Sequence, residues 1–341
     1  MDPQARQPAA AATLRDVARL AGVSVSTASK ALNERPHVRA STREAVRAAA
    51  DQLSFSPNSL AQGLSAQRTG TVGLLTSDLE GRFSIPVLMG AEDAFGSDRV
   101  AVLLCDARGD AIREQHHLRA LLARRVDGLI VVGARPDVRP SIGRVPVPVV
   151  YAYAPSDDPG DLSLVSDNER AGAMAVEHLL ASGRRRIGHV TGDPTYGAAR
   201  DRAAGALAAL ERAGLELAGG EPFYGAWSEE WGRSAQRALL RAVPEVDAVF
   251  AGSDQVARGV LDALREAGRR VPEDVAVVGF DNWEAIATGS RPSLTTVDLQ
   301  LQHLGRVAAQ RLSAAMSGDA RQGVERLPCR LVVRASSAPR D

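Results

Sequence analysis

Acidic and hydroxyl side chains follow several short apolar runs in the larger, C-terminal part of the sequence. They are Asp78 after TVGLLT, Asp193 after RIGHVTG, Ser253 and Asp254 after VDAVFAG, and Asp281 after VAVVGF. If the runs are parallel strands, these side chains face one cleft, because ligands bind outside the carboxyl ends of such strands. Carboxylates accept hydrogen bonds from hydroxyl groups, and an indole covers the apolar face of a sugar. The pattern therefore favours a site for a polyhydroxylated small molecule, although an acidic residue at a strand end is more often a helix cap.

The apolar runs that would position these residues are typical of buried parallel strands. They are rich in Val, Ile and Leu without alternation, and helical segments separate them, at about 114–125, 171–183, 202–214 and 255–268. This βαβ order predicts an α/β class with doubly wound parallel sheets. Two sets of roughly 100 to 130 residues predict two similar lobes. We expect lobe one at about 71–165 plus 295–326, and lobe two at about 166–294 plus 327–341, within a domain over 71–341.

The first seventy residues follow a different, all-helical pattern. Residues 1–12 lack periodicity and are expected to be a disordered tail. Three helix starts follow: T-x-x-D spacing at Thr13, a capping serine at Ser24 after the break at Gly22, and S-x-x-E spacing at Ser41. Two short helices joined by a tight turn and supported by a third predict a helix-turn-helix unit over 13–57. Helix lengths alone fit a small structural cap equally well.

The surface of the second helix separates these alternatives. With Ala28, Ala31 and Leu32 turned inward, the outer face carries Val25, Ser26, Ser29 and Lys30, and Lys30 is the only lysine among the 341 residues. A face that is small, without acids, and has one long cation can approach base edges in a major groove. Residues 1–64 hold eight basic and five acidic residues in a chain of zero net charge, which also favours an anionic partner.

The run TLRDVARLAGVSVSTASKALN, followed by VRASTREAV and FSPNSLAQGL, closely resembles the DNA-binding head of LacI/GalR-type transcriptional regulators. The resemblance is dense over about fifty residues and includes the recognition-helix pattern V-S-x-x-T-x-S-[RK]-x-L-N. It implies two sets of DNA contacts. Bases would be read by Val25, Ser26 and Lys30, and the phosphate backbone would be bound by Ser24, Thr27, Ser29 and Asn33.

Residues 58–70 form the expected hinge and linker. A segment this short that contains Gly63 is not helical alone in water, so its order must come from a partner. In the resembled family it is a hinge helix that forms on DNA, pairs with its twin and inserts a leucine into the minor groove. The matching positions are Asn58, Ala61 and Leu64, with Leu64 as the inserted residue. The alternative is a plain flexible linker.

The larger part resembles the periplasmic-binding-protein-like effector domain of the same family, through DNERAGAMAVEHL, GRRRIGHVTG, RDRAAGALAAL and VPEDVAVVGFDN. By this resemblance Arg202 is the cleft arginine and Trp227 the stacking aromatic. Ser253, Asp254 and Asp281 supply polar cleft contacts, and Asp167 lies on the hinge side next to Asn168.

One stretch departs from the family pattern. Where the family has N-P-F-F or N-P-F-Y after the first strand, this chain has Gly81 to Ser84, so Phe83 is kept and Ser84 replaces an aromatic. The change favours a ligand that is smaller, differently shaped, or met by Arg82.

Motifs of enzymes are missing from the sequence. It contains no G-x-G-x-x-G after the first apolar run, no G-x-x-x-x-G-K-[ST], no G-x-S-x-G and no H-E-x-x-H. His116 and His117 are adjacent and would diverge on a helix, so we expect no metal site and no cofactor. Cys105 and Cys329 lie in apolar runs and are interpreted as buried thiols. Without a signal peptide or a long apolar run, the protein is expected to be cytoplasmic with no membrane partner.

These features predict a transcriptional regulator, most consistent with a repressor. We expect its partners to be double-stranded operator DNA, a carbohydrate effector in the inter-lobe cleft and a second copy of the chain, because a pseudo-palindromic operator requires a dimer. Two alternatives use the same large domain. One is a solute-binding protein for transport, and the other is an α/β enzyme acting on sugars.

Overall fold

The computed structural model describes residues 12–33, 36–55, 69–79, 82–96 and 100–338. These divide between Thr69 and Gly70 into two compact units, a small head and a large domain. The predictions for residues 1–11 and for the hinge positions Asn58, Ala61 and Leu64 lie outside the described residues.

The head contains three helices, α1 (Leu14–Leu20), α2 (Val25–Leu32) and α3 (Ala40–Gln52). The predicted cap of α1 is present, since Thr13 and Asp16 form a reciprocal capping box. Gly22 adopts φ +66° between α1 and α2, a backbone conformation that favours glycine and lets the chain turn tightly. Ser24 then caps α2 by accepting a hydrogen bond from the backbone N–H of Thr27.

The predicted capping box of the third helix is wrong. Helix α3 begins at Ala40, so Arg39 and not Ser41 occupies the N-cap position, and Arg39 makes no side-chain cap hydrogen bond. Val38 packs against the core of the head immediately before this point. Ser41 and Glu44 therefore lie inside α3 and do not form its cap.

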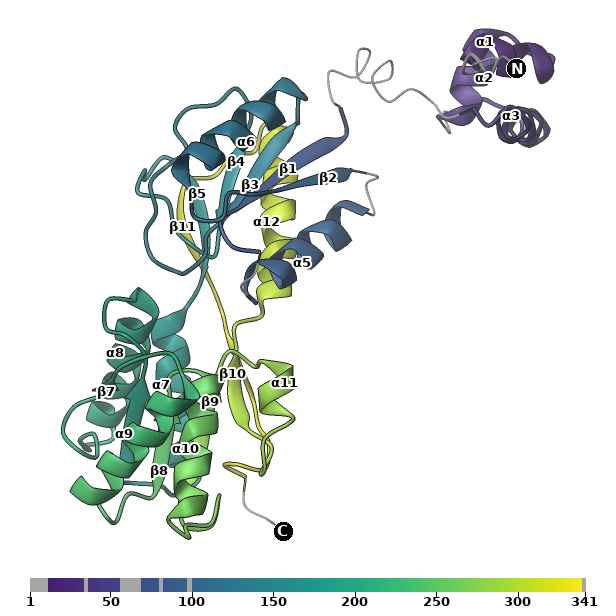
Figure 1. Ribbon diagram of the computed structural model, residues 1–341. Coiled ribbons are helices and arrows are strands. Elements are labelled where there is room, and N and C mark those ends of the chain that lie inside the picture. Colours follow the sequence, from purple (N-terminus) through teal and green to yellow (C-terminus); the bar gives the residue numbers. More distant parts are fainter. Residues whose placement is uncertain (1–11, 34–35, 56–68, 80–81, 97–99, 339–341) are drawn as a thin grey trace, which may run out of the picture. The chain divides into compact units, whose positions relative to one another are not determined.

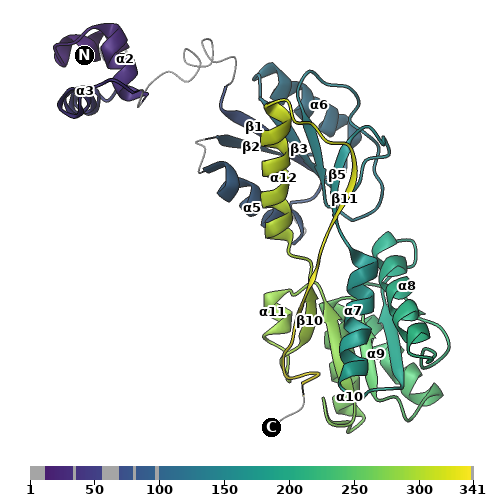
Figure 2. The same ribbon diagram turned by 180° about the vertical axis from the view of Figure 1, so that it is seen from behind.

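The large domain contains two six-stranded sheets, each of which defines a lobe (Figure 1). In lobe one all strands pair in parallel, in the order β11-β5-β4-β3-β1-β2. Helices α5 and α12 cover one face of this sheet and α6 covers the other, as Figure 2 shows from behind. The bounds are β1 (Thr71–Thr76), α5 (Ser84–Gly96), β2 (Ala101–Asp106), α6 (Ala111–Ala123), β3 (Gly128–Val132), β4 (Val149–Ala152), β5 (Leu162–Ser166), α12 (Leu301–Met316) and β11 (Gly323–Leu327).

Lobe two repeats this plan. Its sheet has the order β12-β10-β9-β8-β6-β7, and only the β10–β12 pair is antiparallel. Helices α7 and α8 pack on one face, and α9 and α10 on the other. The bounds are α7 (Asn168–Ala181), β6 (Ile187–Thr191), α8 (Gly197–Arg212), β7 (Phe223–Tyr224), α9 (Glu229–Ala242), β8 (Ala248–Ala251), α10 (Asp254–Glu266), β9 (Ala276–Phe280), α11 (Glu284–Ala287), β10 (Thr295–Asp298) and β12 (Arg330–Val332).

The chain passes between the lobes after β5, after β10 and after β11. The predicted boundary before residue 295 is wrong, because β10 pairs with β9 in lobe two and the chain crosses only after Asp298. Hydrogen bonds tie the crossing segments together: Asp167 N–H donates to the Leu327 carbonyl at 3.0 Å, and the Ser166 hydroxyl to the Leu299 carbonyl at 3.3 Å. Three chain segments therefore connect the lobes, and hydrogen bonds link these segments to one another.

The helix pairs that cover the sheets approach one another at glycines. A Cβ atom built on any of six helical glycines would lie between 1.8 and 2.2 Å from a carbonyl oxygen of the facing helix. These glycines are Gly90 and Gly305 between α5 and α12, Gly172 and Gly205 between α7 and α8, and Gly232 and Gly259 between α9 and α10. Each helix pair can pack this closely because glycine has no side chain at these positions.

We expect Gly259→Ala to lower the free energy of unfolding by about 2 to 3 kcal/mol, because its methyl group must displace the α9 backbone. The built Cβ lies 1.9 Å from the Glu229 carbonyl oxygen. Gly96→Ala is the matched control, since nothing lies within 4 Å of its built Cβ. Chemical denaturation of both variants measures the difference, and equal stability of the two would contradict this packing argument.

Candidate nucleic-acid interface and ligand cleft

The outer face of α2 matches the pattern expected of a recognition helix. Val25, Ser26 and Lys30 are exposed, and Val25 keeps 43% of its surface accessible. Ala28 and Ala31 are buried against α1 and α3 in the head core. The exposed side chains include no acid, so this face does not repel phosphate.

The residues predicted to contact the DNA backbone also hold the ends of α2. The Ser24 hydroxyl lies 2.8 Å from that of Thr27 and accepts the Thr27 N–H at 3.1 Å. At the other end, Asn33 Nδ2 donates to the Ser29 carbonyl at 2.9 Å. Hydroxyl and amide groups have further donor and acceptor capacity, so a phosphate contact is compatible with these roles.

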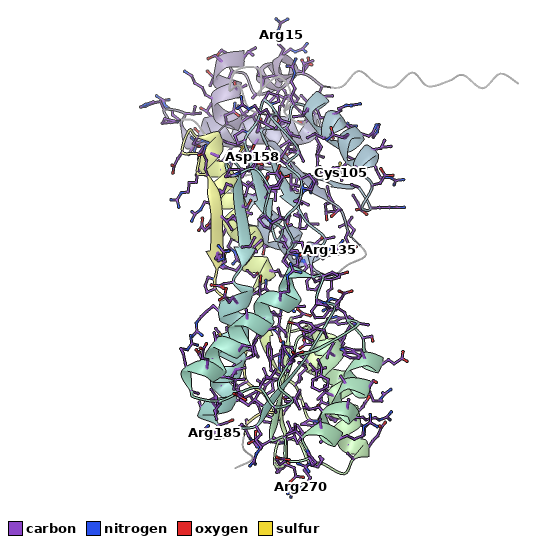
Figure 3. The ribbon with its side chains drawn as sticks, turned by 90° about the vertical axis from the view of Figure 1, so that its left-hand side faces the viewer. Arg15, Cys105, Arg135, Asp158, Arg185 and Arg270 are labelled. Carbon is purple, nitrogen blue, oxygen red and sulfur yellow. The ribbon has the colours of Figure 1, made fainter. Side chains whose placement is uncertain are left out.

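In the large domain, a cavity of about 170 Å³ lies between the lobes, and we call it the cleft cavity. Its walls combine guanidinium groups, one carboxylate and aromatic rings. Lobe one contributes Arg82, Phe83, Ala134, Arg135, Pro136 and Tyr153; lobe two contributes Tyr196, Ala198, Arg202, Trp227, Gln255 and Asp281. Figure 3 shows Arg135 at the junction of the two lobes, far from Arg185 and Arg270 at the outer end of lobe two.

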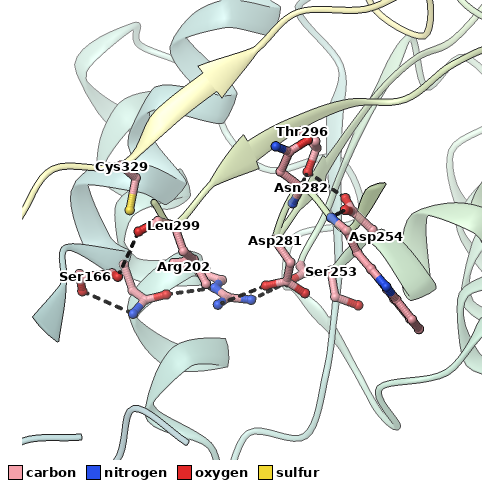
Figure 4. A network of polar contacts seen from close by, with 12 residues as sticks. Ser166, Arg202, Ser253, Asp254, Asp281, Asn282, Thr296, Leu299 and Cys329 are labelled. Carbon is pink, nitrogen blue, oxygen red and sulfur yellow. Dashed lines mark hydrogen bonds and ion pairs between the residues drawn. The ribbon is translucent and has the colours of Figure 1, made fainter. Parts of the chain in front are cut away.

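Arg202 is a deeply buried charge in the wall of this cavity, at 3% exposure. Its Nε donates to Asn168 Oδ1 at 3.0 Å and its Nη1 to the Gly252 carbonyl at 2.6 Å, while its Nη2 lies 3.7 Å from Asp281 Oδ1 (Figure 4). The Phe280 ring packs 3.6 Å from the guanidinium carbon. Burial lowers the pKa of Arg202, and Asp281 opposes this effect. The guanidinium is thus fixed before any ligand enters.

An unusual backbone conformation at the end of β9 orients the Asp281 side chain. Asp281 and Asn282 have φ values of +106° and +52°, which non-glycine residues rarely adopt and which mark functional sites when the surroundings enforce them. Enforcement comes from Thr296, whose hydroxyl accepts the Asn282 N–H at 3.2 Å, and from Arg334, which donates to Asn282 Oδ1 at 2.9 Å. The Asp281 carboxylate consequently faces both Arg202 and Arg82.

Arg82 joins the lobes. Its Nη2 forms an ion pair with Asp281 Oδ2, and its Nη1 donates to Gln255 Oε1 at 3.2 Å. The guanidinium lies over the Phe83 ring at 4.7 Å and the Trp283 ring at 4.6 Å. A second link is made by Asp137 of lobe one, which accepts the Gly197 N–H at the start of α8 at 2.7 Å.

Two aromatic pairs line opposite walls. Phe83 stacks on Tyr153 at 5.2 Å in lobe one, and Tyr196 meets the edge of Trp227 at 6.0 Å in lobe two. Flat apolar rings beside fixed polar groups are typical of sites that bind small polar molecules with an apolar face.

Asp254 supports the cavity from behind. It is fully buried, and its two oxygens accept hydrogen bonds from the Thr296 hydroxyl at 2.6 Å and from the Trp283 N–H at 2.7 Å (Figure 4). Burial, and secondly the charge of Asp281, raise the pKa of this carboxyl to about 7. Asp254 therefore titrates near neutral pH.

Of the nine predicted effector contacts, the structure brings Phe83, Arg202, Trp227 and Asp281 to the cleft cavity. The other five do not line it. The Ser84 hydroxyl is hydrogen-bonded to the Thr76 hydroxyl at 3.0 Å inside lobe one, and Asp78 is not part of the cavity wall. Asp167 and Ser253 cap α7 and α10, and Asp254 fixes Trp283 and Thr296 as described above. For Asp167 and Ser253 the helix-cap alternative describes the observed contacts.

Besides three small apolar residues, sequence reasoning missed four polar or aromatic cavity residues, Arg135, Tyr153, Tyr196 and Gln255. Tyr153 ends the run VPVVYAY and could have been found by the same strand-end argument, and it too has a positive φ, +73°. The other three lie in loops or in a helix, where no local pattern marks them. Arg135 lies over the Tyr196 ring at 4.8 Å across the cleft.

A larger hollow of about 720 Å³ adjoins the cleft cavity and shares Ala134 and Arg135 with it. Its other charged groups are already paired, since Arg139 donates to both carboxylate oxygens of Glu114 at 2.7 and 2.8 Å. The smaller cavity has three buried polar atoms without a hydrogen bond in the described structure, against one, Asp137 Oδ2, in the larger hollow, and is for that reason the stronger ligand site.

Membrane-spanning helices and metal-binding clusters are absent from the described part of the chain. None of its helices is long and apolar enough to span a bilayer, and it holds no group of three His, Cys, Asp or Glu side chains placed to bind a metal ion.

Residues 13–58 match the family of bacterial regulatory proteins, lacI family, and residues 176–337 match the periplasmic binding protein-like domain. The ribose operon repressor of Escherichia coli strain K12 is 36% identical over 302 residues, covering 87% of this chain and 91% of that protein. The chain belongs to the LacI family. The transcriptional regulator CelR of Thermobifida fusca is 35% identical over 335 residues, 95% of this chain and 98% of its own length.

Solved structures of LacI-family proteins share the fold. The crystal structure of the lac repressor dimer bound to operator and the anti-inducer ONPF superposes with a TM-score of 0.77 at 30% identity, covering 97% of this chain and 100% of that one. The predicted fold class and family are confirmed, and this LacI-family chain is a DNA-binding transcriptional repressor with an effector domain. Its curated relatives are regulators, so the enzyme alternative is set aside.

Asp254→Asn tests the buried carboxyl. Because the folded-state pKa of about 7 lies above the ordinary value of about 4, the folded protein keeps a proton that the unfolded chain loses between these pH values. Stability from protonated Asp254 is therefore present at low pH and lost as pH rises toward 7. We expect the wild type to lose about 2 kcal/mol relative to the Asn variant between pH 5 and pH 8.

Urea denaturation of both proteins at several pH values measures this change. Asp319→Asn, at an exposed position, is the control. A difference between wild type and Asp254→Asn that stays constant with pH would exclude a neutral-range titration at Asp254.

Proposed function

We propose that this chain binds a pseudo-palindromic operator as a homodimer. A small carbohydrate-type effector that binds in the cleft cavity changes its affinity for that DNA. The observation that carries the proposal is the cavity itself, whose polar groups and aromatic rings come from both lobes. A ligand there contacts Arg82 and Phe83 of one lobe together with Arg202 and Asp281 of the other. Its binding free energy consequently depends on how the lobes are arranged.

Relatives support each part of this proposal. One solved relative is described as a lac repressor dimer bound to operator, and another as a CelR–cellobiose complex, 31% identical with a TM-score of 0.64. The curated relative noted above is a repressor of a ribose operon. These descriptions favour a sugar-class effector and a dimer on DNA.

Lobe one also carries a surface suited to self-association. Helix α5 exposes Ile85 and Met89, 40% and 52% accessible, which lie one turn apart on the same side of the helix. The neighbouring strand β2 is at the edge of its sheet and exposes Leu104. An apolar patch beside an open sheet edge is typical of a protein interface.

On the α2 face, we propose that Val25, Ser26 and Lys30 contact bases and that Ser24, Thr27, Ser29 and Asn33 position the helix on phosphates. Lysine has the charge and reach of arginine but lacks the bidentate fork that reads guanine. Asn58, Ala61 and Leu64 stay predicted hinge contacts with the minor groove.

We expect Lys30→Ala to weaken specific DNA binding by about 1 to 3 kcal/mol, because one charge-assisted contact is lost. Lys30→Arg should preserve affinity and change the preferred base at one operator position. Selection of bound fragments from genomic DNA, followed by binding titrations at several salt concentrations, provides both measurements.

Two outcomes would count against these assignments. Failure to enrich any genomic fragment would contradict sequence-specific binding by the chain. Identical operator selection by wild type and both variants would remove Lys30 from the residues that read bases and leave that role to Val25 and Ser26.

A further inference from the structure

Arg82 is the feature of the cleft cavity that the family pattern does not account for. It belongs to the departing stretch Gly81 to Ser84, and its side chain is 25% exposed. The two aromatic rings on either side of the guanidinium hold it in the cavity wall. Its Nε is buried and has no hydrogen-bond partner among the described atoms.

Two arginines share one carboxylate at this point. Asp281 Oδ2 pairs with Arg82, and Asp281 Oδ1 lies 3.7 Å from Arg202 without a hydrogen bond. Arg202 also donates hydrogen bonds to Asn168 and to the Gly252 carbonyl, so its guanidinium does not need a ligand as a partner. Among the residues that the structure describes, the hydrogen-bond partners of Arg82 are Asp281 and the neutral Gln255. The cavity therefore lacks a second anion.

The charges of the whole lining agree with this. The described wall contains three guanidiniums, of Arg82, Arg135 and Arg202, and a single carboxylate. Two further acids lie nearby without lining the cavity, and one of them, Asp137, pairs with Arg135 and offsets part of its charge. Asp137 accepts the Gly197 N–H and is 4.0 Å from Arg135, and Asp254 faces Thr296 and Trp283.

Unpartnered atoms define what a ligand must supply. Two buried donors, Arg82 Nε and Trp227 Nε1, and one buried acceptor, Asp281 Oδ1, have no hydrogen bond in the described structure. Buried polar atoms in folded proteins are nearly always satisfied, so these three indicate a bound partner with acceptors and a hydroxyl. The aromatic rings beside them suit a compact ring or chain with an apolar face.

We propose that the effector is an anionic sugar derivative, a small polyol that carries a carboxylate or a phosphate and places it on Arg82. This inference rests on the proposed effector function of the cleft. The anion accepts from the Arg82 guanidinium, and a ligand hydroxyl donates to Asp281 Oδ1. Because the space is about 170 Å³, below the roughly 300 to 1,000 Å³ of pockets for drug-sized ligands, the effector is of monosaccharide size.

Matched pairs of ligands test the charge directly. The full-length protein is titrated with neutral sugars and their acids or phosphates, such as glucose, gluconate, glucuronate and glucose 6-phosphate, with the corresponding galactose and ribose series. Melting temperature and calorimetry report binding. We expect at least one anionic member to bind at least tenfold more tightly than its neutral parent, and the carboxylate and phosphate arms to show which anion fits.

Variants of Arg82 test whether this residue causes the preference for anionic over neutral ligands. Arg82→Gln should weaken binding of the anionic ligand by about 10- to 100-fold, which is typical of a lost hydrogen bond to a charged group, and should weaken binding of the neutral parent by a clearly smaller factor. Arg82→Lys keeps the charge without the fork and should fall between the two. Arg119→Gln, on the exposed face of α6 and outside the cavity lining, is the matched control.

The outcomes separate this inference from the function beneath it. A neutral sugar that binds more tightly than its acid and phosphate, with equal affinity for wild type and Arg82→Gln, would overturn the anionic assignment and leave a carbohydrate effector in place. If no member of either series binds, the carbohydrate-type effector itself is contradicted, and the anionic assignment with it.

Discussion

The buried guanidinium of Arg202 is the constraint on which the cleft depends. An isolated charge at 3% exposure is strongly unfavourable, so its partners must be fixed in place before the lobe is stable. They come from α7, from the end of β8 and from the end of β9, and the last of these is Asp281. Satisfying one cation thus sets the position of the carboxylate that faces the ligand.

The same residue connects the cavity to the segments that join the lobes. Asn168, which accepts from Arg202, also donates to the Ser166 carbonyl, and the Ser166 hydroxyl bonds Leu299 in the second crossing segment (Figure 4). The proposed effector contacts, through Arg82 in lobe one and Asp281 in lobe two, would therefore act on a connection whose segments are already joined by hydrogen bonds. A ligand that prefers one lobe arrangement shifts the equilibrium toward it by its differential affinity. Physical continuity gives a route for coupling, and only a measured coupling energy establishes its use.

Local chemistry was predictable from sequence where one segment decides the outcome. The Thr13 and Asp16 cap, the Ser24 cap and the inward positions Ala28 and Ala31 all follow from spacing within a few residues. Position in the sheet was less predictable, because pairing of β10 with β9 is a choice between lobes that a local pattern does not contain. The start of α3 was also mispredicted, since Arg39 and not Ser41 occupies its N-cap position.

The cleft shows the same division between local and tertiary information. The strand-end argument led to Asp281, which lines the cleft cavity, yet Ser253 after β8 and Asp167 after β5 are helix caps. Whether a strand-end side chain caps a helix or faces a cavity depends on backbone direction, such as the positive φ of Asp281, which sequence spacing does not specify. Arg82 could be noticed as a departure in the sequence, but its pairing with Asp281, 199 residues away, could not.

The central claim is that DNA binding and cleft binding are coupled in one molecule. Operator affinity measured by fluorescence anisotropy with and without saturating effector, alongside effector affinity with and without operator, tests it most directly. The account predicts that both affinities change by the same factor, within the range of about 5- to 150-fold that is typical of allosteric coupling. Tight binding of both ligands with neither affinity altered by the other would contradict it.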